Sequence, residues 1–123
     1  MMQDNELTEK IIGCAIEVHR NLGPGLLESI YEKALCYELE SKGLLYKNQV
    51  IVPVMYKNTC LGDFRLDLVV EDRVIVELKA VERNDPVFKA QLMSYMKLTD
   101  KKLGLLINFN VPLLKDGITR VIL

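Results

Sequence analysis

The chain has 123 residues, half of them hydrophobic, and a formal net charge of −1 at pH 7. This length predicts one domain spanning residues 1–123, and the composition argues against a disordered chain. The near-neutral charge excludes a protein that coats DNA through a uniformly basic surface. No apolar run approaches the ~20 residues of a membrane span, and the polar N-terminal stretch MMQDNELTEK has none of the features of a targeting peptide. We therefore expect a cytoplasmic protein with no membrane contact.

The cysteines give no sign of a structural zinc site. Cys14, Cys36 and Cys60 are odd in number and widely spaced, and His19 is the one histidine. Structural zinc needs four Cys or His ligands, usually in close pairs. We expect three free, mostly buried thiols in a reducing compartment.

The first part of the chain predicts two helices. Apolar residues recur at helical spacing from residue 6 to residue 22, and Gly-Pro-Gly then ends the pattern. A second amphipathic helix is expected from about residue 26 to residue 42, ending at Gly43. Glu28 lies in its first turn, where a carboxylate suits the helix dipole. This capping role is the alternative to any chemical role for Glu28, and Tyr31, one turn on, is expected on the same face.

From about residue 49 the pattern indicates strands. The segment VIVPVMY, a turn at Lys57-Asn58 and strands at residues 60–70 and 73–80 predict a three-stranded antiparallel meander. Pro53 places the first of these strands at a sheet edge, or at a bulge.

A third helix and two further strands complete the pattern. Asp85-Pro86 predicts the start of a helix that runs to about Leu98. Gln91 and Tyr95 are four residues apart and share one face of it, beside the expected core row Phe88, Leu92 and Met96.

The apolar segment at residues 103–109 predicts a buried strand, and residues 118–123 predict a last short strand. Since the third helix forms a crossover between two strands, the sheet is expected to be mixed. The predicted class is α/β, with a three-stranded antiparallel meander, a crossover helix and further strands, flanked by helices.

Three ionisable residues interrupt the apolar hairpin RLDLVVEDRVIVELKA. If residues 71–73 form the turn, Asp67 faces Glu77 across the strands at ~5 Å between Cβ atoms. Lys79 lies two residues beyond Glu77 and shares its face. Two carboxylates this close repel unless a cation lies between them, so the pattern predicts a metal site. The alternative is a surface hairpin with a solvated row of charges, and a one-residue register shift would separate the carboxylates.

Three motifs occur in order: G-x-x-E-x-x-Y at residues 25–31, D-x₉-E-L-K at residues 67–79 and Q-x-x-x-Y at residues 91–95. Together they resemble the PD-(D/E)XK nuclease superfamily, whose fold is the restriction-endonuclease-like core. The first motif resembles the one that names the prokaryotic GxxExxY family within it. The resemblance extends from about Ile11 to Val121.

The resemblance implies a divalent-metal-dependent nuclease, a hydrolase of phosphodiester bonds. Carried over by position, Asp67 and Glu77 would hold Mg²⁺ or Mn²⁺ with the backbone carbonyl of Leu78, and Glu28 would add a carboxylate from the helix.

The same resemblance assigns roles to three further side chains. Lys79 would orient the attacking water and offset charge on the phosphate. Gln91 and Tyr95 would position the substrate or a metal-bound water.

The expected substrate is nucleic acid, with DNA favoured over RNA. The chain is close to a minimal core and lacks a strong basic face: the net charge is −4 for residues 1–45, zero for residues 46–96 and +3 for residues 97–123. We therefore expect a homodimer or a partner protein, since exposed strand edges invite pairing, or a small or structured substrate. The alternatives are a non-catalytic module that binds nucleic acid or a nucleotide, and a regulatory subunit on the same fold.

Overall fold

The computed structural model describes residues 2–123, and the elements follow the predicted order of two helices, three strands, a helix and two strands. The helices are α1 (Asp4–Leu22), α2 (Glu28–Ser41) and α3 (Pro86–Thr99). The strands are β1 (Tyr46–Tyr56), β2 (Thr59–Val70), β3 (Val74–Lys79), β4 (Leu103–Asn108) and β5 (Ile118–Ile122). A 3₁₀ turn, η1 (Leu114–Gly117), precedes β5 and was not predicted.

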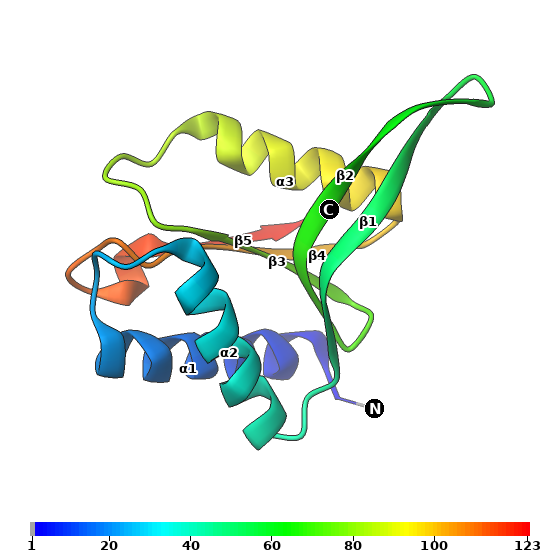
Figure 1. Cartoon of the computed structure of the whole chain (residues 1–123). Helices are drawn as coiled ribbons and strands as arrows, with labels where there is room; N and C mark the ends of the chain where they lie inside the picture. Colours follow the sequence, from blue (N-terminus) through cyan, green and yellow to red (C-terminus); the bar gives the residue numbers. More distant parts are fainter. Residues whose placement is uncertain (1) are drawn as a thin grey trace.

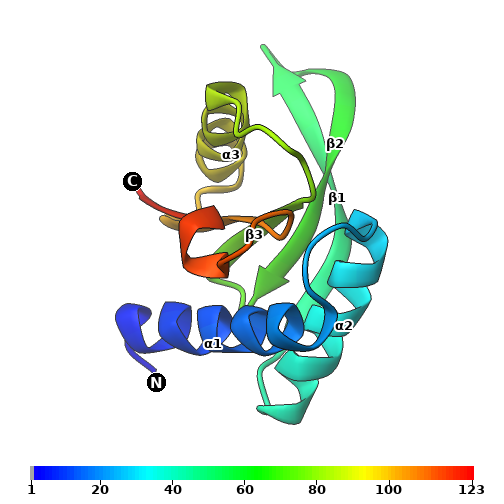
Figure 2. The same cartoon turned by 90° about the vertical axis from the view of Figure 1, so that its left-hand side faces the viewer.

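The strands form one mixed sheet in the order β1-β2-β3-β4-β5 (Figure 1). The pairs β1–β2, β2–β3 and β4–β5 are antiparallel, and β3–β4 is parallel because α3 connects them as a crossover. Helices α1 and α2 lie against one face of the sheet, and α3 lies on the other (Figure 2). The predicted α/β class and mixed sheet are confirmed.

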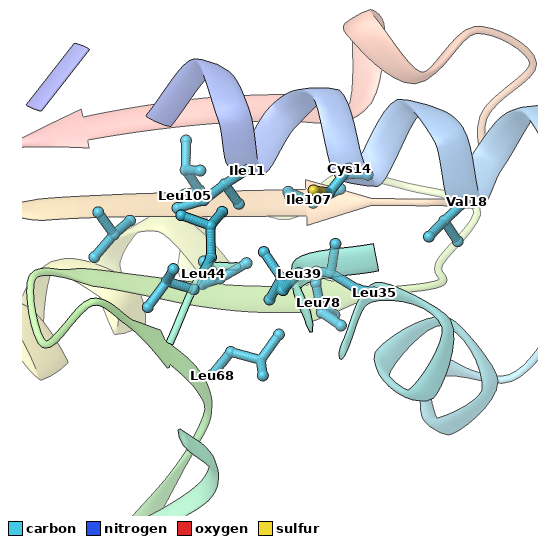
Figure 3. Close-up of a cluster of buried hydrophobic side chains, with 14 of the residues drawn as sticks. Ile11, Cys14, Val18, Leu35, Leu39, Leu44, Leu68, Leu78, Leu105 and Ile107 are labelled. Carbon is cyan, nitrogen blue, oxygen red and sulfur yellow. The ribbon is translucent and has the colours of Figure 1, made fainter. Parts of the chain in front are cut away.

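The larger of two hydrophobic cores lies between the sheet and the pair α1–α2 (Figure 3). Strands β3 and β4 have almost no exposed side chain because both of their faces are covered, which explains why their sequences read as continuous apolar runs. The labelled members of this core are Ile11, Cys14, Val18, Leu35, Leu39, Leu44, Leu68, Leu78, Leu105 and Ile107.

Helix α3 approaches β4 very closely in the second core. A Cβ atom at Gly104 would lie 2.7 Å from Met96 Sδ and 3.1 Å from the Leu92 methyl carbons. Both side chains have no exposed surface, so neither has room to move away. The absence of a side chain at Gly104 therefore sets the distance between α3 and the sheet.

Most predicted boundaries lie within three residues of the observed ones. Lys57 and Asn58 form the expected turn with φ of 46° and 66°, and the Asp85 side chain caps α3 by accepting a hydrogen bond from Val87 N at 2.9 Å. Pro53 lies on an edge strand, as predicted. All three cysteines are free, but the expectation of mostly buried thiols was wrong: Cys14 is buried, Cys36 is half-buried, and Cys60 is exposed on the β1–β2 hairpin.

No helix within residues 2–123 combines the length and the hydropathy that crossing a bilayer requires.

Gly104→Ala should lower the free energy of unfolding by about 1–3 kcal/mol, because the added methyl group overpacks the contact with α3. Urea unfolding followed by circular dichroism measures this change. Gly13→Ala is the matched control: a Cβ at this exposed position in α1 meets no atom within 4 Å, so stability should stay unchanged or rise by up to about 1 kcal/mol. Equal stability of the two variants would contradict the close contact of Gly104 with Met96 and Leu92.

Candidate active site

Strands β2 and β3 part next to Asp67. Their pairing runs from Val70↔Val74 to Leu68↔Val76 and then stops, which is the register predicted from a turn at residues 71–73. Beyond this point the Asp67 carboxylate takes the place of a backbone partner, because its Oδ2 accepts a hydrogen bond from Leu78 N at 2.8 Å. The Asp67 carboxylate therefore lies between β2 and β3, and Asp67 itself is opposite Glu77 in the register.

The backbone of β2 turns over at the same residue. Leu66 and Leu68 are two residues apart, so a regular strand would place them on one face. Leu66 instead belongs to the core under α3, and Leu68 belongs to the core under α1 and α2. Across from Asp67, Gln49 of β1 has a φ of 53°, and neither residue takes part in the regular β1–β2 register. This irregularity gives the Asp67 side chain access to both β3 and the start of α2.

Glu77 is a buried carboxyl group on the central strand. It is 7% exposed, and its Oε1 has no hydrogen-bond partner among the described residues. Burial first, and the neighbouring Asp67 carboxyl second, raise the pKa of Glu77 to about 9. An unpaired buried oxygen is costly, and a hard divalent cation would satisfy it. The residues thus fit a cation between Asp67 and Glu77.

Lys79, the last residue of β3, lies beside this pair. Its Nζ is 4.5 Å from the centroid of the Phe88 ring of α3, a distance at which a cation–π interaction is attractive. Its charge also partly lowers the pKa of Glu77. The structure therefore brings the three residues of the D-x₉-E-L-K motif together, as alternation along the strands predicted.

Tyr95 of α3 lies near both carboxylates, and the exposed Gln91 reaches this group only through Tyr95. The pKa of Tyr95 is raised by burial, by Glu77 and by Asp67, in that order, and is lowered by a side-chain hydrogen bond with Gln91. The Tyr95 ring stacks on Phe64 of β2, with centroids 4.3 Å apart and planes at 2°. The phenol is thus held near Glu77 and Asp67 by an aromatic residue that sequence analysis did not identify.

Glu28, the first residue of α2, is exposed and lines a cavity together with Asp67. A surface cavity of about 400 Å³ is lined by Glu28, Ser29, Glu32, Gln49, Asp67 and Leu78. Within residues 2–123, however, no three Asp, Glu, His or Cys side chains gather closely enough to hold a metal ion. Glu28 therefore shares a cavity with Asp67 without joining the Asp67–Glu77 pair, and its role as a ligand stays a prediction.

Tyr31 positions the start of α2 from within the core. Its hydroxyl donates to Gly23 O at 2.5 Å and accepts from Leu26 N at 3.1 Å. Its fully buried ring stacks on Phe109 with centroids 4.4 Å apart. The expectation that Tyr31 shares a face with Glu28 was wrong: the tyrosine faces the core, whereas the glutamate faces the cavity. Tyr31 thereby ties the glycine-rich turn to α2.

Glu32 was also missed by sequence analysis. Its Oε1 accepts from Gln49 Nε2 at 2.6 Å, and its Oε2 accepts from Asn48 Nδ2 at 3.4 Å. These bonds tie α2 to β1 at the rim of the cavity. Its spacing four residues after Glu28 places both on one helical face, and this signal could have identified it.

A family model of the PD-(D/E)XK nuclease superfamily matches residues 5–121. The match covers nearly the whole chain, and the chain belongs to that superfamily. Its nucleases typically use divalent metals, in agreement with the partnerless oxygen of Glu77. No curated protein and no solved structure matches the chain.

Tyr31→Phe should lower the free energy of unfolding by about 1–3 kcal/mol, since it leaves the Leu26 N–H and the Gly23 carbonyl without their partner. Thermal and urea unfolding measure the loss. Tyr37→Phe makes the same change at a tyrosine of α2 that is 71% exposed, and it should be neutral. If both variants match the wild type, Tyr31 does not hold the turn.

Glu77→Gln should change how stability depends on pH in the metal-free protein. The folded-state pKa of about 9 exceeds the ordinary value of 4.5, so the contribution of this carboxyl is complete below pH 4.5 and is lost as the pH rises towards 9. Glutamine mimics the protonated group, so the variant should be the more stable protein at pH 9 by more than about 1.4 kcal/mol, the equivalent of one pKa unit.

Urea unfolding with a chelator at pH 5, 7 and 9 measures this difference. Glu82→Gln, at an exposed position after β3, is the control for loss of one negative charge. Parallel pH curves for wild type and Glu77→Gln would contradict a carboxyl that is protonated when buried.

Proposed function

We propose that this chain is a divalent-metal-dependent nuclease of the GxxExxY family, which hydrolyses phosphodiester bonds in nucleic acid and prefers DNA to RNA. The observation that carries the proposal is the buried Glu77 carboxyl beside Asp67, with an oxygen that lacks a partner within the described residues. Superfamily membership adds nucleic acid as the substrate class.

Asp67 and Glu77 would hold the ion, Mg²⁺ or Mn²⁺, because carboxylate oxygens are the ligands these hard cations prefer. The backbone carbonyl of Leu78 would complete the protein ligands, and Glu28 would act from the cavity that it shares with Asp67. When bound, the ion supplies a water molecule of lowered pKa and neutralises charge on the phosphate.

The remaining side chains would bind and orient. Lys79 would orient the attacking water and offset the charge that develops on the phosphate. Its position close to Glu77, where its charge lowers the pKa of that carboxyl, supports this role. Tyr95 would position substrate, fixed by its stacking on Phe64. Gln91 would assist by holding the Tyr95 hydroxyl.

Assembly as a homodimer, or with a partner protein, is part of the same proposal. Strand β1 is an edge strand whose outer side pairs with no other described strand. The hairpin β1–β2 exposes Ile51, Met55 and Leu61, each more than half accessible. Exposed apolar groups beside an open edge support an interface with another chain.

Lys79→Ala should leave the affinity for Mg²⁺ unchanged while lowering kcat by about 10²–10³-fold, the range found when one stabilising donor is removed. Glu77→Ala should lower both metal affinity and kcat, each by at least about tenfold. Calorimetry with Mg²⁺ and Mn²⁺, together with cleavage assays on single- and double-stranded DNA and RNA, tests both variants.

Lys10→Ala is the matched control, because it removes a lysine from an exposed position of α1 and should change neither quantity. A wild type that binds no divalent ion, or equal cleavage by all variants, rejects the nuclease. Binding of nucleic acid without metal dependence or turnover would favour the non-catalytic module or a regulatory subunit instead.

A further inference from the structure

Asn108 is a buried polar side chain at the end of β4. It is 7% exposed, and the parallel register pairs it with Lys79 at the end of β3. Neither the proposed metal site nor the proposed substrate contacts include it. A buried carboxamide in an otherwise apolar strand is retained only where its donors and acceptors find partners.

The carboxamide of Asn108 binds the backbone just beyond Lys79. Its Oδ1 accepts from Val81 N at 3.1 Å, and its Nδ2 donates to Val81 O at 2.9 Å. The same Oδ1 accepts from Asn110 N at 3.1 Å. Oδ1 accepts two hydrogen bonds and Nδ2 donates one, so the two ends of the carboxamide cannot be exchanged and its orientation is fixed. The side chain thus continues the β-ladder at Val81, two residues after β3 ends.

The adjoining backbone holds Lys79 itself. Phe109 N donates to Lys79 O at 2.9 Å, so the chain is anchored at Lys79 by one bond and at Val81 by two. On the other side, Leu78 N is anchored by Asp67. The Lys79 Cα therefore lies between fixed points, and the direction in which its long side chain leaves the strand is set.

We propose that Asn108 is a positioning residue, which keeps the Lys79 ammonium beside Glu77 by fixing the backbone after β3. This inference rests on the proposed function, in which Lys79 acts on the attacking water. Release of Val81 would let the end of the strand open, and a displacement of about 1 Å at a reacting group can lower a rate about 100-fold. The Asn108 side-chain hydrogen bonds go to Val81 and Asn110 and, within the described residues, none goes to Lys79 or Glu77, so the proposed effect passes through the backbone.

The first arm of the test is hydrogen exchange, measured by NMR on the metal-free protein. Asn108→Ala should raise the exchange rates of the Val81 and Asn110 amides by about tenfold or more, because both lose their acceptor. Asn108→Asp replaces the amide nitrogen, which donates to Val81 O, with a carboxylate oxygen that cannot donate. This substitution should loosen the segment without changing the side-chain volume. Thr8→Val is the control: it removes another buried polar group, bonded to Asp4 O and Asn5 O in α1, and should leave Val81 unaffected.

The second arm is cleavage under single-turnover conditions. Asn108→Ala should lower the cleavage rate constant by about 10–100-fold while KM and Mg²⁺ affinity change little. In the Lys79→Ala background the same substitution should produce no further loss, since the residue it positions is absent. Thr8→Val should cleave at the wild-type rate in both backgrounds. If Asn108→Ala does not fold, Asn108→Asp takes its place in both arms.

An equal loss in both backgrounds overturns the proposal, because a general structural defect does not depend on Lys79. Unchanged exchange of Val81 in both variants also overturns it. A wild type that cleaves no nucleic acid rejects the proposed function, and with it the catalytic purpose of Asn108. Faster Val81 exchange in the variants would then identify Asn108 as a backbone anchor alone, so the two failures are distinguishable.

Discussion

The hydrogen bond from the Leu78 amide to the Asp67 carboxylate joins β2 and β3 at the place where their backbones part. A wider separation would leave the Leu78 amide without an acceptor inside the protein. The side-chain bond satisfies the amide while keeping the strands apart, so the Asp67 and Glu77 carboxyls can face each other. The arrangement of Lys79, Tyr95 and Glu28 around this point depends on it.

Alternation and turn chemistry are sufficient to predict that Asp67, Glu77 and Lys79 lie together, whereas the places of Glu28, Gln91 and Tyr95 were expected from the family resemblance. A turn at the charged residues 71–73 pairs the two apolar strand segments in one register, with Val70 opposite Val74. That register places Asp67 opposite Glu77. Lys79 follows by the two-residue period of a strand. The order of elements follows equally well, because each helix has a clear apolar face and the breakers lie between the elements. These are local features, and each is encoded within a few neighbouring residues.

The parts that could not be predicted depend on contacts distant in sequence. Alternation places Leu66 and Leu68 on one face, whereas the irregular pairing at Gln49 turns β2 over between them. Asn108 lies one residue before the end of the apolar strand predicted at residues 103–109, and its partners are backbone atoms, which have no residue-specific signature. The stacking of Phe64 on Tyr95 joins residues 31 positions apart. The distance between Glu28 and the Asp67–Glu77 pair likewise depends on how α2 packs. The number of residues between them in the sequence does not determine that packing.

The hairpin β1–β2 has a consequence for engineering the molecule. Beyond the point where β2 leaves β3, the two strands pair only with each other and extend past α3 (Figure 1). Every residue from 55 to 63 is exposed, so the turn at Lys57 and Asn58 contributes nothing to either core. Exposed hairpin tips of this kind accept inserted segments, because an insertion there disturbs no buried packing. An epitope or a fluorophore attachment site can therefore be introduced at this tip while Asp67 and its neighbours keep their positions.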